Sequence, residues 1–395
     1  MDPETQQTPP ALEPTQPGPL ESTPESMSLG FPGEEPGQDT EKAYRGLKWI
    51  FVGPQGLRAG WSILIVVSLL ILLGRTLSYV IAKLHLVTKG AAFGPRQAFF
   101  GELFQVFLLT LCVAIVAAIE HRHLLDYNLR GPRRIGHFIS GLVVGFAALS
   151  ALVGAMAWGG WLHFGPVALQ GSQIFKYAAI WGATFLLVGL FEEGSMRCYL
   201  QYTLTRGINF WWAAGPIALM CGFLIFRIKG NGAWGVYIIA LLGLFPCLWL
   251  HWSKSPQSGF WQAAWLTSTL FGFGHTGNNG ENWIGIFAAA FIGFVFCVSV
   301  WLTGSAWWAI GCHAAWDWAE TYFYGTADSG LVAPGHLLST TTTGNPLWSG
   351  GADGPEGSLL IIPIVLLLLA WLLVIYRRPA PSQFSAPAVT EQLAS

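Results

Sequence analysis

The sequence has few charged residues. Only 10% of its 395 residues are Asp, Glu, Lys or Arg, against about 25% in a typical soluble protein. Because 53% of the residues are apolar, a soluble globule could not cover its surface, and most of the chain is expected to face lipid. The formal net charge of −1 argues against a nucleic-acid partner. Disorder of the whole chain is excluded because disorder requires low hydrophobicity.

Three sequence signals are also missing. The chain does not open on a basic stretch followed by an apolar run, so a cleavable signal peptide is not expected. The six cysteines include no Cys-x-x-Cys pair, which favours buried free thiols over a disulfide framework. No Asn-x-Ser/Thr sequon occurs. Together, the missing sequon and signal peptide favour a bacterial inner-membrane protein.

The few charges are unevenly distributed. Residues 1–40 contain eight of the 21 acidic residues and nine prolines, but no Lys or Arg. Such a segment buries too little apolar surface to offset the entropy of ordering. We therefore predict a disordered, acidic and proline-rich tail at 1–45, and a second tail at 379–395.

The remaining chain contains repeated apolar runs close to the ~20 residues that cross a bilayer. They predict an all-α, polytopic membrane protein with about ten transmembrane helices. The runs are residues 60–83, 98–119, 138–158, 174–205, 211–228, 232–250, 259–275, 283–302, 305–324 and 358–377. The segment 325–357 is rich in Gly, Thr and Ser and is expected to form an extramembrane loop. A C-terminal transmembrane helix is expected at 358–378.

Basic residues gather beside the first span, between the second and third spans, and after the last span. They are Lys42, Arg45, Lys48, Arg58, Arg122, Arg130, Arg133, Arg134, Arg377 and Arg378. Basic loops lie mainly on the cytoplasmic side, and ten spans return the chain to the side where it began. We therefore expect both termini in the cytoplasm.

Ionisable side chains at membrane depth are costly, and they persist where they pair or perform a function. In the fourth run, Glu193 and Arg197 are four residues apart, so a helix places them on one face as an ion pair. Glu192 lies about 100° away around the helix, which leaves it available as a general base. The alternative is an interfacial charge cluster at a helix end. Isolated charges such as Glu102 and Glu320 are interpreted as structural.

Two histidines lie in similar surroundings. His275 ends an apolar run and is preceded by Phe271-Gly272-Phe273-Gly274. His313 and Asp317 are again four residues apart, so Asp317 could orient the imidazole ring. The alternatives are an interfacial histidine at position 275 and a buried polar pair that holds helices together.

These three motifs together resemble the CAAX protease and bacteriocin-processing family of intramembrane endopeptidases, which includes the type II CAAX prenyl proteases. Glu192-Glu193-Gly194-Ser195-Met196-Arg197, Phe271 to His275, and His313 to Asp317 follow the family order Glu-Glu-x-x-x-Arg, Phe-x-x-x-His and His-x-x-x-Asn/Asp. The resemblance implies a catalytic core at 174–324, preceded by N-terminal spans at 46–173. An extra hairpin at about 211–250 separates the first two motifs, which lie on consecutive helices in the family.

The resemblance also implies a role for each residue. Glu192 and His275 would activate the attacking water. His313 and Asp317 would stabilise the oxyanion, although Asp317 replaces the commoner Asn. The remaining motif residues, Glu193 and Arg197, would support the site.

Several alternatives stay open at this stage. A Zn²⁺ held by Glu192, His275 and His313 with a water would also satisfy the ligand rules of catalytic zinc, and no other cofactor is expected. Intramembrane Glu, His and Asp also form proton relays, so a proton-coupled transporter is the main rival, followed by an inactive scaffold. The expected partners are the lipid bilayer and a protein or peptide substrate. A prenylated C-terminus, a bacteriocin leader and a membrane-anchored regulator all remain candidates.

Overall fold

The computed structural model describes residues 48–53, 56–84, 94–227, 233–278 and 280–377. The chain divides into two units, Met1–Trp49 and Ile50–Ser395, and only Lys48 and Trp49 of the first are described. The predicted tails at 1–45 and 379–395 therefore lie outside the described residues.

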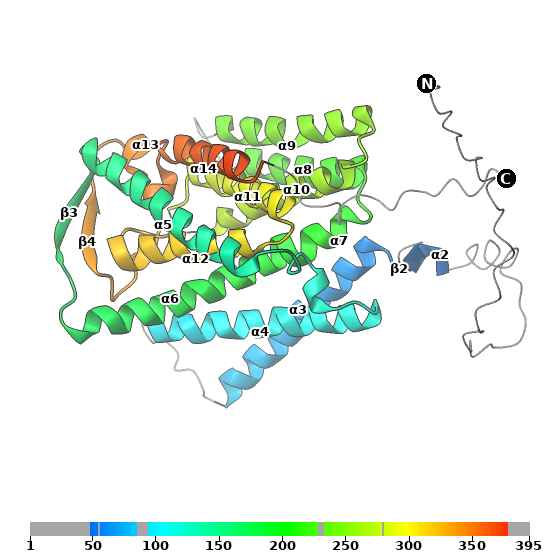
Figure 1. Ribbon diagram of the computed structural model, residues 1–395, viewed down its shortest axis with the longest axis horizontal. Coiled ribbons are helices and arrows are strands. Elements are labelled where there is room, and N and C mark those ends of the chain that lie inside the picture. The colour runs from blue at the N-terminus through cyan, green and yellow to red at the C-terminus, as the bar shows by residue number, and fades with distance from the viewer. Residues whose placement is uncertain (1–47, 54–55, 85–93, 228–232, 279, 378–395) are drawn as a thin grey trace, which may run out of the picture. The chain divides into compact units, whose positions relative to one another are not determined.

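The described chain is mostly helical (Figure 1). Its longer helices are α3 (Ala59–Lys83), α4 (Pro95–Ile119), α5 (Arg134–Trp158), α6 (Ser172–Glu193), α8 (Phe210–Arg227), α9 (Ala233–Ser253), α10 (Ser258–Gly274), α11 (Trp283–Thr303), α12 (Trp307–Asp317) and α14 (Ile361–Ile375). The shorter ones are α2 (Lys48–Phe51), α7 (Gln201–Thr205) and α13 (Pro346–Ser349). Two π-helical segments, Gly194–Leu200 and Trp318–Tyr324, directly follow α6 and α12.

Five helical stretches among the described residues are long and apolar enough to cross a membrane. They are α3, α4, α5, the continuous stretch Ser172–Thr205 that includes α6 and α7, and α11. Shorter apolar helices occupy Phe210–Phe226 and Ile361–Ile375. A helix occurs at each of the ten predicted runs, but the number of ten membrane spans is not confirmed.

The structure also contains short strands that the all-α prediction did not include. β3 (Leu162–Val167) pairs antiparallel with β4 (Leu338–Thr342) at one end of the helices (Figure 1), and β1 (Val52–Gly53) pairs with β2 (Gly56–Leu57). β4 lies within the predicted 325–357 loop, where consecutive β-branched threonines favour extended backbone. This segment therefore has regular structure, including β4 and α13.

Helix α12 lies between α5 and α6 (Figure 1). Glycines allow the close approach to α5. A Cβ atom at Gly141 would overlap the carbonyl oxygen of Trp308, one at Gly145 that of Cys312, and one at Gly311 that of Phe138. Such small residues let helix backbones approach closely in a membrane, where packing stabilises association. The contact fixes the helix that presents His313.

We expect Gly145→Ala to destabilise the protein by about 1–3 kcal/mol, because overpacking a close contact forces the backbone apart. Gly154→Ala is the matched control on the same helix, since nothing lies within 4 Å of a Cβ atom there. The melting temperatures of the two variants in detergent give the comparison. Equal melting temperatures would show that the α5–α12 contact tolerates a methyl group.

Candidate active site

The two adjacent glutamates at the end of α6 lie in different environments. The side chain of Glu193 is fully buried, whereas that of Glu192 is 34% exposed. The π-helical segment Gly194–Leu200 begins directly after them. A π-helical turn changes the direction of the side chains that follow it and is frequent at functional sites.

Glu193 and Arg197 form a fully buried ion pair, as their spacing indicates. Arg197 Nε lies 3.1 Å from Glu193 Oε2, and Arg197 Nη1 donates a hydrogen bond of 3.3 Å to Oε1. The guanidinium group lies over the ring of Phe271, 4.5 Å from its centroid. Space for it exists because Gly293 has no side chain, since a Cβ atom there would lie 2.5 Å from Arg197 Nη2. Asn128 also donates a 2.7 Å hydrogen bond to the Arg197 carbonyl.

His313 is oriented by Glu193. Its Nδ1 atom lies 2.8 Å from Glu193 Oε1, and its ring stacks on Phe296 at a centroid distance of 5.8 Å. The other ring nitrogen, Nε2, lies 3.4 Å from Asp317 Oδ2 and 3.7 Å from Glu192 Oε2. The sequence suggested that Asp317 orients this ring. In the structure Glu193 occupies Nδ1, while Asp317 and Glu192 face Nε2.

His275 follows α10 directly and opens a short 3₁₀ turn, His275–Gly277. Its Nδ1 atom lies 2.8 Å from the carbonyl oxygen of Phe271. A carbonyl oxygen can only accept a hydrogen bond, so Nδ1 bears the proton and Nε2 of the neutral ring is an acceptor. The same Phe271 thus contacts Arg197 through its ring and holds His275 through its backbone.

These side chains line one cavity of about 230 Å³. Glu192, His275, His313 and Asp317 are in its wall, together with the apolar residues Ala288, Ala289, Ile292 and Phe296. Glu193 and Arg197 lie behind this wall. Glu193 contacts the wall residue His313, and Arg197 pairs with Glu193. The structure therefore places four of the six predicted site residues at the cavity and the other two in support of them.

Glu192, His275 and His313, all among the residues that the structure describes, do not each bring a potential ligand atom within 4.8 Å of the others. Among the described residues, the group whose potential ligand atoms all lie within 4.8 Å of one another consists of Glu320, Asp328 and Glu356 instead. We therefore expect hydrolysis without zinc.

Sequence reasoning missed several carboxylates at this cavity. Glu102, Glu281, Asp328 and Glu356 also line it. A signal for most of them was present in the sequence, because residues 255–376 contain six acidic residues and no Lys or Arg. Acidic groups without neighbouring basic residues must be neutralised by protons, histidines or bound cations once they are buried.

Glu281 and Asp353 form a carboxyl pair in the loops that precede α11 and α14. A Cβ atom at Gly285 would overlap both Glu281 Oε1 and Asp353 Oδ2, so these oxygens lie close together beside that glycine. Burial, with the nearby charges of Asp353 and Glu356, raises the pKa of Glu281 to about 9. Burial likewise raises the pKa of Asp353 to about 6.

This pair predicts a pH dependence of stability. An unfolded Glu has a pKa near 4.3, so between about pH 4.5 and 9 the folded state holds a proton on Glu281 that the unfolded state has lost. The free energy of unfolding therefore falls as pH rises through this window, by up to about 1.4 kcal/mol per pH unit. Glu281→Gln should flatten this slope. The melting temperature of the variant should therefore exceed that of the wild type by the largest amount near pH 8.5. Parallel curves from pH 5 to 8.5 would contradict this.

A helical membrane region that gathers a glutamate, two histidines and an aspartate around one cavity is typical of membrane enzymes that activate water. Residues 249–319 match the family model described as type II CAAX prenyl endopeptidase Rce1-like. The match confirms the resemblance found in the motifs, and it indicates a CAAX-type protease with peptide substrates in a membrane environment. No curated protein and no solved structure matches the chain.

The matched residues cover less than a fifth of the chain. They include His275, His313 and Asp317, whereas Glu192, Glu193 and Arg197 lie outside them. The glutamate motif is tied to the matched region by the contacts of His313 with both glutamates. No comparison supports a transporter.

Proposed function

We propose that this protein is an intramembrane endopeptidase that hydrolyses peptide bonds of membrane-associated or lipidated proteins. The observation that carries the proposal is the convergence of Glu192, His275 and His313 on one cavity. Support comes from the family match over the two histidine motifs. The expected core at 174–324, the cytoplasmic termini and the bacterial inner membrane remain predictions.

Water is activated by Glu192 and His275. Glu192 is the partly exposed carboxylate of the glutamate pair, so a water at the cavity can reach it. His275 Nε2 accepts the other hydrogen bond of this water, because the Nδ1–H of the ring is donated to the Phe271 carbonyl. The two acceptors position the water, and Glu192 takes its proton as the oxygen attacks the scissile carbonyl carbon. When the tetrahedral intermediate collapses, the C–N bond breaks and Glu192 gives this proton to the leaving amine nitrogen.

The oxyanion is stabilised by His313. In its doubly protonated form, the ring donates Nδ1–H to Glu193 and presents Nε2–H at the cavity. A donor held in place before the reaction stabilises developing negative charge without reorganisation. Glu193 is fixed by Arg197, so the ion pair behind the wall positions the ring. Asp317 Oδ2 lies 3.4 Å from Nε2 and accepts a hydrogen bond from Nε2–H until the oxyanion forms.

Purified full-length protein in lipid nanodiscs provides the test. The substrate is a peptide that ends in Cys followed by two aliphatic residues and a terminal residue, with an isoprenyl thioether on the cysteine. We expect mass spectrometry to show cleavage, and slower cleavage of the same peptide without lipid. A protein that cleaves neither peptide but moves protons across liposomes in a Glu192-dependent manner would overturn the proposal in favour of the transporter.

The role of zinc can be measured with the same assay. We expect activity to persist within about twofold after treatment with 1,10-phenanthroline, which removes zinc and leaves calcium in place. Metal analysis of the treated protein confirms removal. Loss of activity that added Zn²⁺ restores would replace the glutamate-activated water by a metal-bound one.

A further inference from the structure

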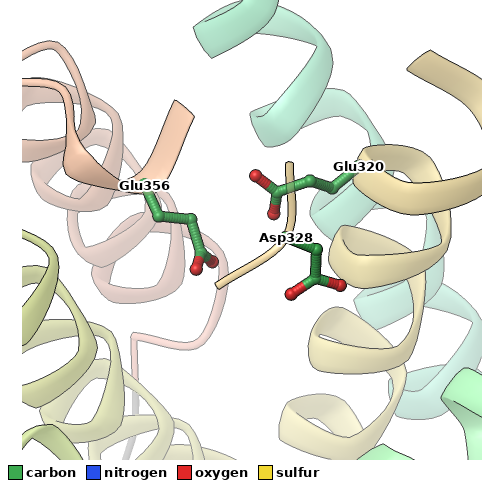
Figure 2. A group of neighbouring side chains, drawn as sticks. All are labelled: Glu320, Asp328 and Glu356. Atoms are coloured by element: carbon green, nitrogen blue, oxygen red, sulfur yellow. The ribbon is translucent and has the colours of Figure 1, made fainter. Parts of the chain in front are cut away.

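A second group of acidic side chains lies beside the proposed active site. Glu320 comes from the π-helical segment Trp318–Tyr324, Asp328 from the loop after it, and Glu356 from the turn before α14. Figure 2 shows the three carboxyl groups pointing into one shared space. One oxygen from each lies within 4.8 Å of the others.

Glu320 is the member that makes this cluster unusual. Its side chain is completely buried, and neither of its carboxylate oxygens has a hydrogen-bond partner. The other two members are partly satisfied: Thr321 donates a 2.7 Å hydrogen bond to Asp328 Oδ2, and Trp316 donates one of 2.9 Å to Glu356 Oε1. A buried carboxylate without a partner costs several kcal/mol, so Glu320 must either hold a proton or face a positively charged occupant.

Within the part of the chain that the structure describes, no Lys or Arg side chain neutralises the three carboxylates. No Lys or Arg of the described residues forms an ion pair with any member of the cluster. The nearest basic residues in sequence are Lys254 and Arg377, far to either side of the three acids. The charge of the three acids is therefore left to protons, to the histidines of the cavity or to a bound cation.

We propose that Glu320, Asp328 and Glu356 bind a divalent cation, with Ca²⁺ as the ion that fits best. All three ligands are carboxylate oxygens, which hard cations prefer. Oxygens bound to one ion lie at most twice the ion–oxygen distance apart, about 4.6–5.2 Å for Ca²⁺ and about 4.0–4.2 Å for Mg²⁺. The three oxygens lie within 4.8 Å of one another, a separation that Ca²⁺ can bridge. Waters and a second oxygen of Asp328 or Glu356 complete the coordination.

The ion fastens three segments that are far apart in sequence. Glu320 lies three residues after Asp317, and Glu356 is hydrogen-bonded to Trp316 of α12. Asp328 and Glu356 line the cavity of the proposed active site. Bound Ca²⁺ thus holds the end of α12 against the turn before α14 and acts as a structural support. This inference does not depend on the proposed protease activity.

Calcium binding to the full-length, detergent-purified protein provides the test. After EGTA treatment and desalting, calorimetric titration with CaCl₂ should show saturable binding of one ion, and added Ca²⁺ should raise the melting temperature. Glu320→Gln and Asp328→Asn should each weaken binding at least tenfold and abolish the temperature shift. MgCl₂ titrated in parallel should bind more weakly.

Asp126→Asn is the matched control, because Asp126 lies in a separate loop and pairs with Arg130. It should bind Ca²⁺ like the wild type. Glu320→Gln removes an unpartnered buried charge and should fold, and Glu356→Gln supplies a further test at a partly exposed position. Absence of divalent-ion binding by the folded wild type would overturn the proposal, as would binding that persists unchanged in all three cluster variants. Because the readout is binding, failure here leaves the protease proposal untouched.

Discussion

Glu192→Gln should lower the rate of peptide hydrolysis by about 10²–10⁴-fold, the usual contribution of a positioned general base. Gln keeps the shape of the side chain but cannot take a proton from water. Because Glu192 is partly exposed and its carboxylate lies 3.7 Å from His313 Nε2, its replacement should leave the fold intact. The measurement is the single-turnover rate in nanodiscs, together with the melting temperature of each protein.

Two comparisons make this result specific. Asp126→Asn also neutralises one carboxylate, at a site away from the cavity, and should retain wild-type activity. His275→Ala should lose activity in the same assay, since it removes the second acceptor for the water. A folded Glu192→Gln protein that cleaves at the wild-type rate would remove the basis of the proposed mechanism.

Arg197→Met should destabilise the protein by about 3–5 kcal/mol, the usual cost of removing one partner of a buried ion pair. Met fills part of the space but leaves the buried Glu193 carboxylate without its ion-pair partner and with His313 as its remaining contact. The aromatic surface of Phe271 that faces the guanidinium group would also lose its cation. The change is measured by SDS titration of helicity in mixed micelles.

The double variant Glu193→Gln/Arg197→Met separates charge from packing. It removes both charges, while the Gln oxygen can still accept a hydrogen bond from His313 Nδ1–H. We expect it to be more stable than Arg197→Met alone, because the buried carboxylate that has lost its Arg197 partner is gone. Stability equal to or below that of Arg197→Met would show that the pair contributes mainly through packing.

Local patterns in the sequence were sufficient for the helices and for contacts within one helix. The apolar run at 283–302 corresponds to α11, and the run at 60–83 to α3. A four-residue spacing predicted the Glu193–Arg197 ion pair, which the structure contains. These features depend on the helical period alone.

Contacts between helices could not be predicted in this way. The bond between Glu193 and His313 joins residues 120 positions apart, and nothing in either local pattern indicates which ring nitrogen faces which carboxylate. The pairing of β3 with β4 likewise joins distant segments. Both depend on how α12 packs between α5 and α6, where glycines permit close contact.

The sequence by itself determined that this chain belongs in a membrane, because it has too few charges to cover a soluble surface, and it marked the fourth apolar run as exceptional. Tertiary structure decided how its two glutamates differ. Packing against α12 buries Glu193 and leaves Glu192 at the cavity. Only that packing also brought Glu320, interpreted from sequence as an isolated structural charge, together with Asp328 and Glu356. Burial concentrates charges that the sequence keeps apart, and the need to neutralise them is a property of the fold.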